Sequence, residues 1–396
     1  MYDIPAPPDY NPITPTTREG PTTKLETPNQ KLERLLASQA KIAENKSKLI
    51  TFSQPILSQN DNPVFFPKTI NVIQGKAGVH KSRLAETICS SLLKKMDCHH
   101  DLLHFKCSPF KSYAICYVDT ERNLSEQLPY SLQQIQIKAG YEIEENPYGF
   151  DFISLLEFDR EERFDMLNMY IDHIRKKFQI HLFIVLDVIT DCVFNFNDTK
   201  DSMKLIDMMN QTINRYDVTF LCLIHENPGS ADKARGHLGT EILNKASTVL
   251  QIGFEKDSEN ASTNLIKVSY LKCRSSRKHD PFYVQYSDTE RGLVMADNDL
   301  LTNTIDNRNQ KAGFETTLEF LALWLIQPMT RRELIDKLCE QLKCKERTIE
   351  TRLKQIIKNE IPVVTNNGST LYLCKRSEGK DILYELTNSI PISNKD

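Results

Sequence analysis

The sequence predicts an α/β protein with a mostly parallel central sheet, followed by a smaller C-terminal domain. From about residue 60 to 297, short apolar runs alternate with segments of helical pattern, as expected for parallel strands joined by helices. Most of these runs are too apolar to be half solvated, which fits a sheet covered on both faces. Polar residues follow several of the runs, at the sheet edge where ligands bind in open α/β folds.

The composition is that of an ordinary globular chain. It has 396 residues, of which 40% are hydrophobic and 26% charged, and two or three domains are expected at this length. The net charge of −3 gives no overall basic signal for nucleic acid. Ten scattered cysteines and no signal-peptide pattern favour reduced thiols and a cytoplasmic location. No apolar run approaches the roughly 18 residues of a membrane span.

The first 59 residues precede the alternating region. Residues 1–30 contain seven of the 18 prolines and are expected to form a disordered tail. Residues 31–59 are expected to form a helical arm, in which Leu32, Leu35, Leu36 and Ile42 mark a weak apolar stripe along residues 31–48. Two roles remain open for this arm: docking on a neighbouring subunit, or a solvated helix that leads into the next domain.

The domain at residues 60–297 is expected to contain six principal strands, at 69–74, 113–119, 181–187, 218–225, 248–254 and 265–272. Polar residues end or follow the second, third, fourth and sixth of these strands. We expect these residues to converge on the loop after the first strand; they are Asp119, Glu121, Asp187, His225, Lys272 and Arg274.

The loop after the first strand is the most specific motif. A β-rich run, a glycine loop, a lysine, a hydroxyl residue and a helix follow one another, the arrangement that holds a nucleotide triphosphate through backbone N–H groups and a helix N-terminus. The expected ATP-binding residues are Gly75, Lys76, Ala77, Gly78, Val79, His80, Lys81, Ser82 and Arg83. Lys81 would reach the β- and γ-phosphates, and Ser82 would ligate Mg²⁺. His80 replaces the usual second glycine, where a side chain could crowd the phosphates or strain the turn.

Two acids have the spacing of an ATP-hydrolysing site. The apolar run 183–186 ends in Asp187, the form in which an aspartate holds the Mg²⁺ shell. Glu121 follows the strand next along the chain from the phosphate loop, where a carboxylate could orient or deprotonate the attacking water. The alternative for Glu121 is an ordinary surface acid at a strand end.

Two basic segments follow. His225 ends a strand and could sense the γ-phosphate. The loop at 227–240 after it is rich in glycine and locally basic, so Lys233 and Arg235 are expected to contact a nucleic-acid backbone; the alternative is a mobile surface loop.

Lys272 and Arg274 lie two residues apart at a strand end and could both reach a neighbouring subunit's phosphate, as an arginine finger does. The alternative for this pair is a solvated basic hairpin.

The order of these motifs resembles the RecA-like ATPase core, and most closely its RepA/DnaB-type hexameric helicase branch. The resemblance covers roughly residues 60–295 and matches Lys81, Ser82, Glu121, Asp187, His225, Lys272 and Arg274 one by one. It implies a homo-oligomeric, hexameric ring with ATP sites between subunits and single-stranded DNA in the central channel. His80 departs from the family's pattern. We expect nucleotide binding to survive it.

The C-terminal part is expected to be a linker at 298–312 and a small domain at 313–396. Helical segments at 314–326, 331–342 and 345–358, then two strand-like pieces around Asn366-Asn367-Gly368, resemble a winged helix-turn-helix. The segment at 345–358, the second helix of the helix-turn-helix pair, would carry Lys345, Arg347 and Arg352 toward DNA. Many such domains bind only protein, which remains the alternative.

A group of cysteines and histidines at 98–107 is not expected to bind zinc, because its spacing fits no tetrahedral pattern.

Taken together, the motifs predict an ATP- and Mg²⁺-dependent DNA helicase or translocase that serves replication of a plasmid, phage or mobile element. A primase or replication initiator is a possible partner. The alternatives are an ATP-switched DNA-binding regulator or recombination ATPase of the same fold, and a nucleotide-binding scaffold in which His80 impairs hydrolysis.

Overall fold

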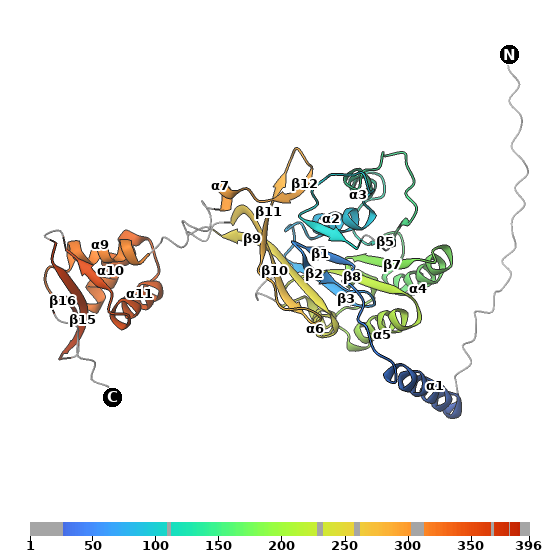
Figure 1. Ribbon diagram of the computed structural model, residues 1–396, viewed down its shortest axis with the longest axis horizontal. Coiled ribbons are helices and arrows are strands. Elements are labelled where there is room, and N and C mark those ends of the chain that lie inside the picture. Colours follow the sequence, from blue (N-terminus) through green and yellow to red (C-terminus); the bar gives the residue numbers. More distant parts are fainter. Residues whose placement is uncertain are drawn as a thin grey trace, which may run out of the picture. The chain divides into compact units, whose positions relative to one another are not determined.

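The computed structural model describes residues 27–108, 112–227, 233–256, 262–301, 313–365, 368–379 and 381–388 (Figure 1). The chain divides into two compact units, residues 1–53 and 54–396. Most of the tail expected at 1–30 and of the linker expected at 298–312 lies outside the described residues.

The described part of the first unit is dominated by one helix, α1 (Pro28–Lys46). Thr27 and Gln30 form a capping box at its start, and Pro28 occupies the first turn, where its missing N–H costs no hydrogen bond. The helix thus begins slightly earlier than the stripe at 31–48 predicted. None of its residues is buried, so both roles proposed for the arm stay predictions.

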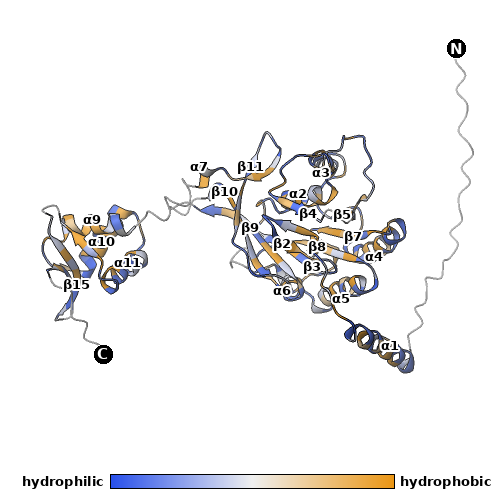
Figure 2. Ribbon diagram, viewed as in Figure 1, coloured by the Kyte–Doolittle hydropathy of each residue, from blue (hydrophilic) through white to orange (hydrophobic). Residues whose placement is uncertain are grey.

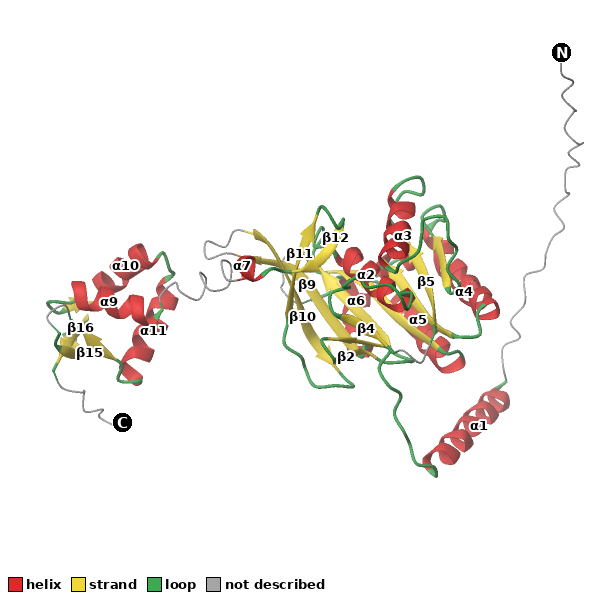
Figure 3. Cartoon of the chain, turned by 45° about the horizontal axis from the view of Figure 1, so that its top comes forward, coloured by secondary structure: helices red, strands yellow, loops and turns green. Residues whose placement is uncertain are grey.

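The second unit contains a nine-stranded sheet in the order β12-β11-β10-β9-β3-β8-β7-β5-β6. Figure 3 draws the strands in yellow and the helices in red. The strands from β9 to β6 are parallel. They are β9 (Thr248–Lys256), β3 (Ile70–Gly75), β8 (Val218–His225), β7 (His181–Asp187), β5 (Tyr113–Asp119) and β6 (Phe150–Ser154). The remaining strands are antiparallel and are β10 (Ser262–Cys273), β11 (Phe282–Ser287) and β12 (Gly292–Met295). This topology confirms the predicted class, an α/β fold with a mostly parallel central sheet.

Helices cover both faces of this sheet. The first face is covered by α2 (Lys81–Leu93) and α3 (Gln127–Lys138), and the second by α4 (Arg160–Lys177), α5 (Thr199–Arg215) and α6 (Gly236–Lys245); the short 3-10 helix η1 (Ile189–Cys192) follows β7. Within β5, Ile115 and Tyr117 face the first layer, whereas Cys116 and Val118 face the second. Both sets are buried because a strand alternates its side chains between faces, which explains the uninterrupted apolar runs (Figure 2).

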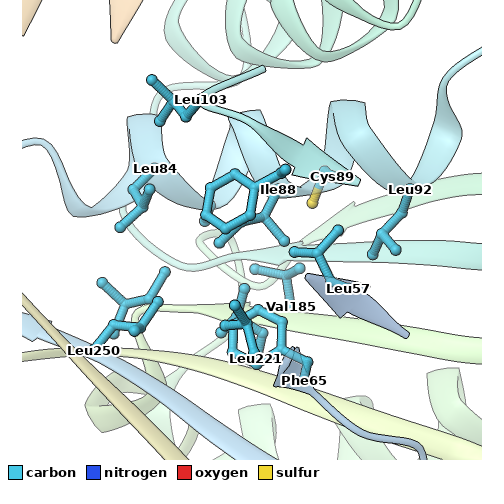
Figure 4. Close-up of a cluster of buried hydrophobic side chains, with 14 of the residues drawn as sticks. Leu57, Phe65, Leu84, Ile88, Cys89, Leu92, Leu103, Val185, Leu221 and Leu250 are labelled. Atoms are coloured by element: carbon cyan, nitrogen blue, oxygen red, sulfur yellow. The ribbon is translucent and has the colours of Figure 1, made fainter. Parts of the chain in front are cut away.

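The core under α2 shows how the phosphate-loop helix is anchored. Leu84 and Ile88 on α2 lie over Val185 and Leu221 of the central strands (Figure 4). A small antiparallel sheet of β2 (Asn62–Phe65), β1 (Leu57–Gln59) and β4 (Phe105–Cys107), which the sequence did not predict, adds Leu57 and Phe65 to the same cluster. The helix that begins at Lys81 is therefore fixed against the sheet by apolar contacts along its buried face.

One expectation about the sheet is wrong. Lys272 and Arg274 were expected at the same edge as the phosphate loop, but β10 runs antiparallel to β9 and pairs Cys273 with Thr248, at the start of β9. Thr248 in turn pairs with Asn71 near the start of β3. The basic pair therefore lies at the edge opposite the phosphate loop. A strand's direction in the sheet depends on its partner, which the local sequence of β10 does not specify.

The C-terminal part of the second unit has its own apolar core. Its helices are α9 (Phe314–Trp324), α10 (Arg331–Leu342) and α11 (Glu346–Lys358), and the short helix α7 (Asn298–Leu301) precedes them. Its sheet has the order β13-β16-β15-β14, built from β13 (Met329–Thr330), β16 (Asp381–Thr387), β15 (Thr370–Glu378) and β14 (Pro362–Val364). The three helices and the antiparallel pair β14–β15 lie where the sequence predicted them, and β13 and β16 were missed. The interpretation as a winged helix stays a prediction.

Among the helices that the structure describes, none is both long and apolar enough to cross a bilayer.

Candidate nucleotide site

The phosphate loop connects β3 to α2 through backbone conformations that explain its glycines. A Cβ on Gly75 would lie 2.4 Å from the Ile252 carbonyl oxygen, so no larger residue fits where β3 passes β9. Gly78 has a φ of 77°, in the left-handed region that glycine adopts at little cost. His80, the cap residue of α2, has a φ of 67° and a ψ of 29° in the same region. The usual glycine at this position is thus explained by backbone geometry.

The ring of His80 is held by two aromatic residues of the neighbouring strands. It stacks on Tyr286 of β11, with centroids 5.1 Å apart and planes 15° apart. Its other contact is edge-to-face with Phe254 of β9, at 5.8 Å. Burial and the nearby Arg83 charge lower the pKa of His80 below its ordinary value, so the ring is neutral at pH 7. These contacts hold the ring against β9 and β11, and whether it crowds the phosphates stays a prediction.

Lys81 is 6% exposed and is held over the loop by three hydrogen-bond partners. Its ammonium donates to the Gly75 carbonyl at 3.1 Å, to the Lys76 carbonyl at 2.8 Å and to His225 Nδ1 at 3.0 Å. Desolvation lowers the pKa of Lys81, while the carboxylates of Asp187, Glu121 and Glu226 oppose that shift. The lysine is therefore positioned by the loop's own backbone at the sheet edge where the other motifs end.

Asp187 and Ser82 come together as the sequence predicted. The Ser82 hydroxyl donates to Asp187 Oδ1 at 3.2 Å, although the two residues are 105 positions apart. Burial raises the pKa of Asp187, and Arg122, Tyr117 and Ser82 counteract that shift. A serine hydroxyl and a carboxylate are the oxygen ligands that Mg²⁺ prefers. His80 makes no side-chain cap on α2, which leaves first-turn N–H groups for an anion. These residues fit ATP with Mg²⁺.

Glu121 and His225 face each other at the open side of the site. Glu121 Oε1 lies 3.8 Å from His225 Nε2, and the Glu121 side chain is 51% exposed. The interaction with His225 is the largest influence on Glu121; together with Lys81 and Arg122 it lowers the pKa of this carboxyl, against a smaller opposing effect of burial. Glu121 is therefore an ionised, accessible carboxylate beside the phosphate loop, and His225 bridges it to Lys81.

Two charged residues of this site were missed from the sequence. Arg122 lies among the carboxylates of Asp119, Asp187 and Glu86, at 2.6, 2.6 and 3.0 Å. Glu226 is 8% exposed and accepts hydrogen bonds from Gln74 and Gln251. Each directly follows a predicted site residue in the chain, which is the only local signal. Their partners come from other strands and from α2, so sequence spacing could not identify them.

The loop expected to contact DNA is described only at its ends. Lys233 and Arg235 are both exposed, and the Arg235 guanidinium lies 5.2 Å from the centre of the Phe196 ring. Phe196 and Arg235 also line a pocket of about 570 Å³. Its other lining residues are Asn197, Asn227, Gly236, His237, Thr240 and Glu241. The Arg235 N–H donates to the His225 carbonyl at 2.8 Å. The start of α6 is thus joined by the backbone to the residue that contacts Lys81.

Lys272 and Arg274 bind the C-terminal end of α6 in the same chain. The Lys272 ammonium donates to the carbonyls of Leu243 and Asn244 at 2.6 and 2.9 Å, and Arg274 Nη2 donates to Asn244 at 2.7 Å. Burial lowers the pKa of Lys272, and the Arg274 charge adds to this effect. The two side chains thus share one target within the chain, the end of α6, and their contact with a neighbouring subunit's phosphate stays a prediction.

The other predicted sites are more dispersed. Lys345, the cap residue before α11, and Arg347 within the helix are exposed, and Arg352 is half-buried. In the segment at 98–107, Cys98 Sγ and His100 Nδ1 both lie near the Lys138 carbonyl oxygen. Within the described ranges no cluster of three or more His, Cys, Asp or Glu side chains could hold a metal.

Comparisons with known proteins find similar solved structures but no related sequence. No protein-family model matches the chain, and no curated protein matches its sequence. Three similar solved structures are the RadB recombinase (14% identity, TM-score 0.40, 58% of this chain and 92% of that chain), a KaiC-like protein from Pyrococcus horikoshii OT3 (15%, 0.44, 59% and 92%), and the flagellar accessory protein FlaH from Methanocaldococcus jannaschii (13%, 0.41, 58% and 90%). Likenesses of this size say nothing about activity.

Proposed function

We propose that this chain is an ATPase of the RecA-like class that acts as a helicase or translocase on single-stranded DNA. One observation carries the proposal: Lys81, Ser82, Asp187, Glu121 and His225 meet at one edge of the sheet. These residues are separated by up to 144 positions in the chain. Their types are those that phosphoryl transfer to water requires: a phosphate-binding lysine, two metal ligands, a carboxylate and a polar sensor.

Each residue has a role that its surroundings support. The loop N–H groups and Lys81 would hold the phosphates, while Ser82 and Asp187 would hold Mg²⁺, which neutralises charge on the β- and γ-phosphates when bound. Glu121 is ionised at neutral pH and accessible to solvent. It therefore orients the attacking water and accepts its proton.

His225 is the proposed connection between this site and DNA. Its ring touches Lys81 and faces Glu121, and its carbonyl accepts from Arg235. A displacement of the His225 backbone on ATP hydrolysis would therefore move Arg235 and the loop before it. Lys233 and Arg235 are exposed cations, and Arg235 lies beside the Phe196 ring, a combination that suits a single strand through phosphate contacts and stacking.

The position of Lys272 and Arg274 supports a site shared between subunits. Both lie at the sheet edge opposite their own phosphate loop, so they could contact an ATP γ-phosphate only in a neighbouring copy. We therefore propose a homo-oligomeric ring, a hexamer by the resemblance. A cytoplasmic location, a primase or initiator partner and replication of a plasmid, phage or mobile element belong to the same proposal.

The decisive experiment is steady-state ATP turnover by the purified protein with and without a single-stranded oligonucleotide. We expect stimulation by single-stranded DNA and no turnover by Lys81→Ala. A matched control is Lys94→Ala, which removes a half-buried lysine whose ammonium donates to the His100 carbonyl oxygen. Equal turnover by wild type and Lys81→Ala would exclude this site. Turnover without any DNA stimulation would exclude the motor and retain the ATPase.

The C-terminal core gives reason for a second candidate, an ATP-switched DNA-binding regulator or recombination ATPase. A separate apolar cluster lies in this part of the chain, and Lys345 at the cap of α11 is exposed together with Arg347 and Lys354 on the helix. Binding of a specific duplex that is weakened by Lys345→Ala/Arg347→Ala, without unwinding, would favour this candidate. Strand displacement by the wild type would favour the motor.

A further inference from the structure

A buried arginine joins three elements beneath the proposed metal position. The Arg122 guanidinium is 16% exposed and contacts Glu86 of α2, Asp119 at the end of β5 and Asp187 at the end of β7. Glu86 and Asp119 are each 1% exposed. Among the described residues, Glu86 forms one other ion pair, with Arg83. The guanidiniums of Arg122 and Arg83 thus face three carboxylates, those of Glu86, Asp119 and Asp187. A buried group of this kind needs fixed geometry, because every carboxylate that loses its partner is left charged in a low-dielectric site.

The two oxygens of Asp187 have different partners. Oδ2 accepts from Arg122 Nη2 at 2.6 Å and from the Tyr117 hydroxyl at 2.7 Å. Oδ1 accepts only from the Ser82 hydroxyl, at 3.2 Å, among the described contacts. Arg122 Nη2 also lies 2.8 Å from the Tyr117 oxygen, so the two donors brace each other. The carboxylate plane is therefore set by its inner oxygen, and its outer oxygen is left directed at Ser82.

The same arginine fixes the chain that carries Glu121. Asp119 Oδ1 accepts from the N–H groups of Glu121 and Arg122, at 3.1 and 2.8 Å. Its Oδ2 accepts from Arg122 Nε at 2.6 Å. The Arg122 side chain therefore connects the turn at Asp119, before Glu121, with Asp187 at the end of the neighbouring strand β7.

We infer that Arg122, braced by Tyr117, is a positioning residue that aims Asp187 Oδ1 at the Mg²⁺ position beside Ser82 and holds Glu121 in register with it. This inference rests on the proposed ATPase function and extends it to residues that touch neither nucleotide nor water. Partners behind a metal ligand typically alter metal affinity by about 10- to 100-fold when removed. The effect of Arg122 should therefore fall on Mg²⁺ and leave the binding of metal-free nucleotide largely intact.

The test is a Mg²⁺ titration of the fluorescent analogue mant-ATP bound to full-length protein, beside its affinity in EDTA. Arg122→Gln should raise the half-saturating Mg²⁺ concentration about 10- to 100-fold while mant-ATP affinity in EDTA changes less than about twofold. Arg122→Lys should recover part of this loss, since a single ammonium keeps the charge but cannot span three carboxylates.

Tyr117→Phe keeps the test decisive if loss of the arginine prevents folding. It removes one hydrogen bond to Asp187 Oδ2 with little change of shape and should raise the half-saturating Mg²⁺ concentration about two- to tenfold. The matched control is Tyr170→Phe, which removes a buried hydroxyl that donates to Asp151 at 2.8 Å on the other face of the sheet. This control should leave the titration unchanged.

The outcomes distinguish failure of the positioning role of Arg122 from failure of the proposed ATPase function. Wild-type protein that binds mant-ATP with Mg²⁺ dependence, together with folded Tyr117→Phe and Arg122 variants that titrate like wild type, would overturn the positioning role alone. Equal losses of affinity with and without Mg²⁺ would also overturn it, since that pattern reports general damage to the fold. Wild-type protein that binds no mant-ATP at all would overturn both.

Discussion

Replacing His80 by glycine tests how the phosphate loop accommodates a residue that its geometry disfavours. His80 has a φ of 67°, and a side chain in this region costs roughly 1–2 kcal/mol that glycine avoids. Its stacking on Tyr286, with centroids 5.1 Å apart, offsets this by about 0.5–1.5 kcal/mol. His80→Gly removes both effects and should change the free energy of unfolding of the ATPase core by no more than about 1 kcal/mol.

The matched variant His80→Ala separates the two effects. Alanine keeps the left-handed strain and loses the stacking, so it should be less stable than glycine at this position by about 1 kcal/mol. Tyr286→Ala, alone and combined with His80→Ala, should give a coupling energy of about 0.5–1.5 kcal/mol. Because the ring lies against β9 and β11, His80→Gly should change ATP affinity by less than about threefold, which is under 1 kcal/mol.

The stability assay must report on the correct core. Trp324 is the only tryptophan and packs against the C-terminal core, so its fluorescence follows that core. Urea unfolding of the ATPase core should therefore be followed by far-ultraviolet circular dichroism, with the Trp324 transition as an internal control that the variants leave unchanged. Equal stability of the glycine and alanine variants would refute the strain argument. A tenfold or larger gain in ATP affinity on His80→Gly would show that the ring obstructs the phosphates.

Three further predictions concern the same site. Glu121→Gln should retain mant-ATP binding and lower kcat by about 10²- to 10⁴-fold; unchanged turnover would remove Glu121 from the role of base. Arg274→Ala should be inactive alone, but mixing it with Lys81→Ala should restore some turnover, because an intact Lys81 and an intact Arg274 can then meet between copies; a mixture without activity would contradict the shared site. Burial lowers the pKa of His80, so the unfolded chain takes up its proton first as pH falls. Its contribution to stability is therefore present above about pH 6.5 and lost below it, and the urea midpoint should fall more between pH 7 and 5 for wild type than for His80→Gly.

Much of the fold could be predicted because its signals are local. The runs that became β5, β7 and β8 were placed at their correct bounds, since strands buried on both faces are apolar without interruption. Their final residues met at one edge because parallel strands end together. Other strands were missed: β6, at the edge of the main sheet, is half-exposed, and β1, β2 and β4 of the small sheet have only three or four residues each.

The sequence by itself determined the phosphate loop and the convergence of Lys81, Ser82, Asp187, Glu121 and His225, because each lies at the end of an apolar strand or the start of a helix. The tertiary structure alone decided the antiparallel direction of β10, which places Lys272 and Arg274 at the far edge. It also decided the aromatic support of His80 and the carboxylate partners of Arg122. These contacts join residues far apart in the chain, and their distances follow from strand pairing and helix packing, which short-range patterns do not encode.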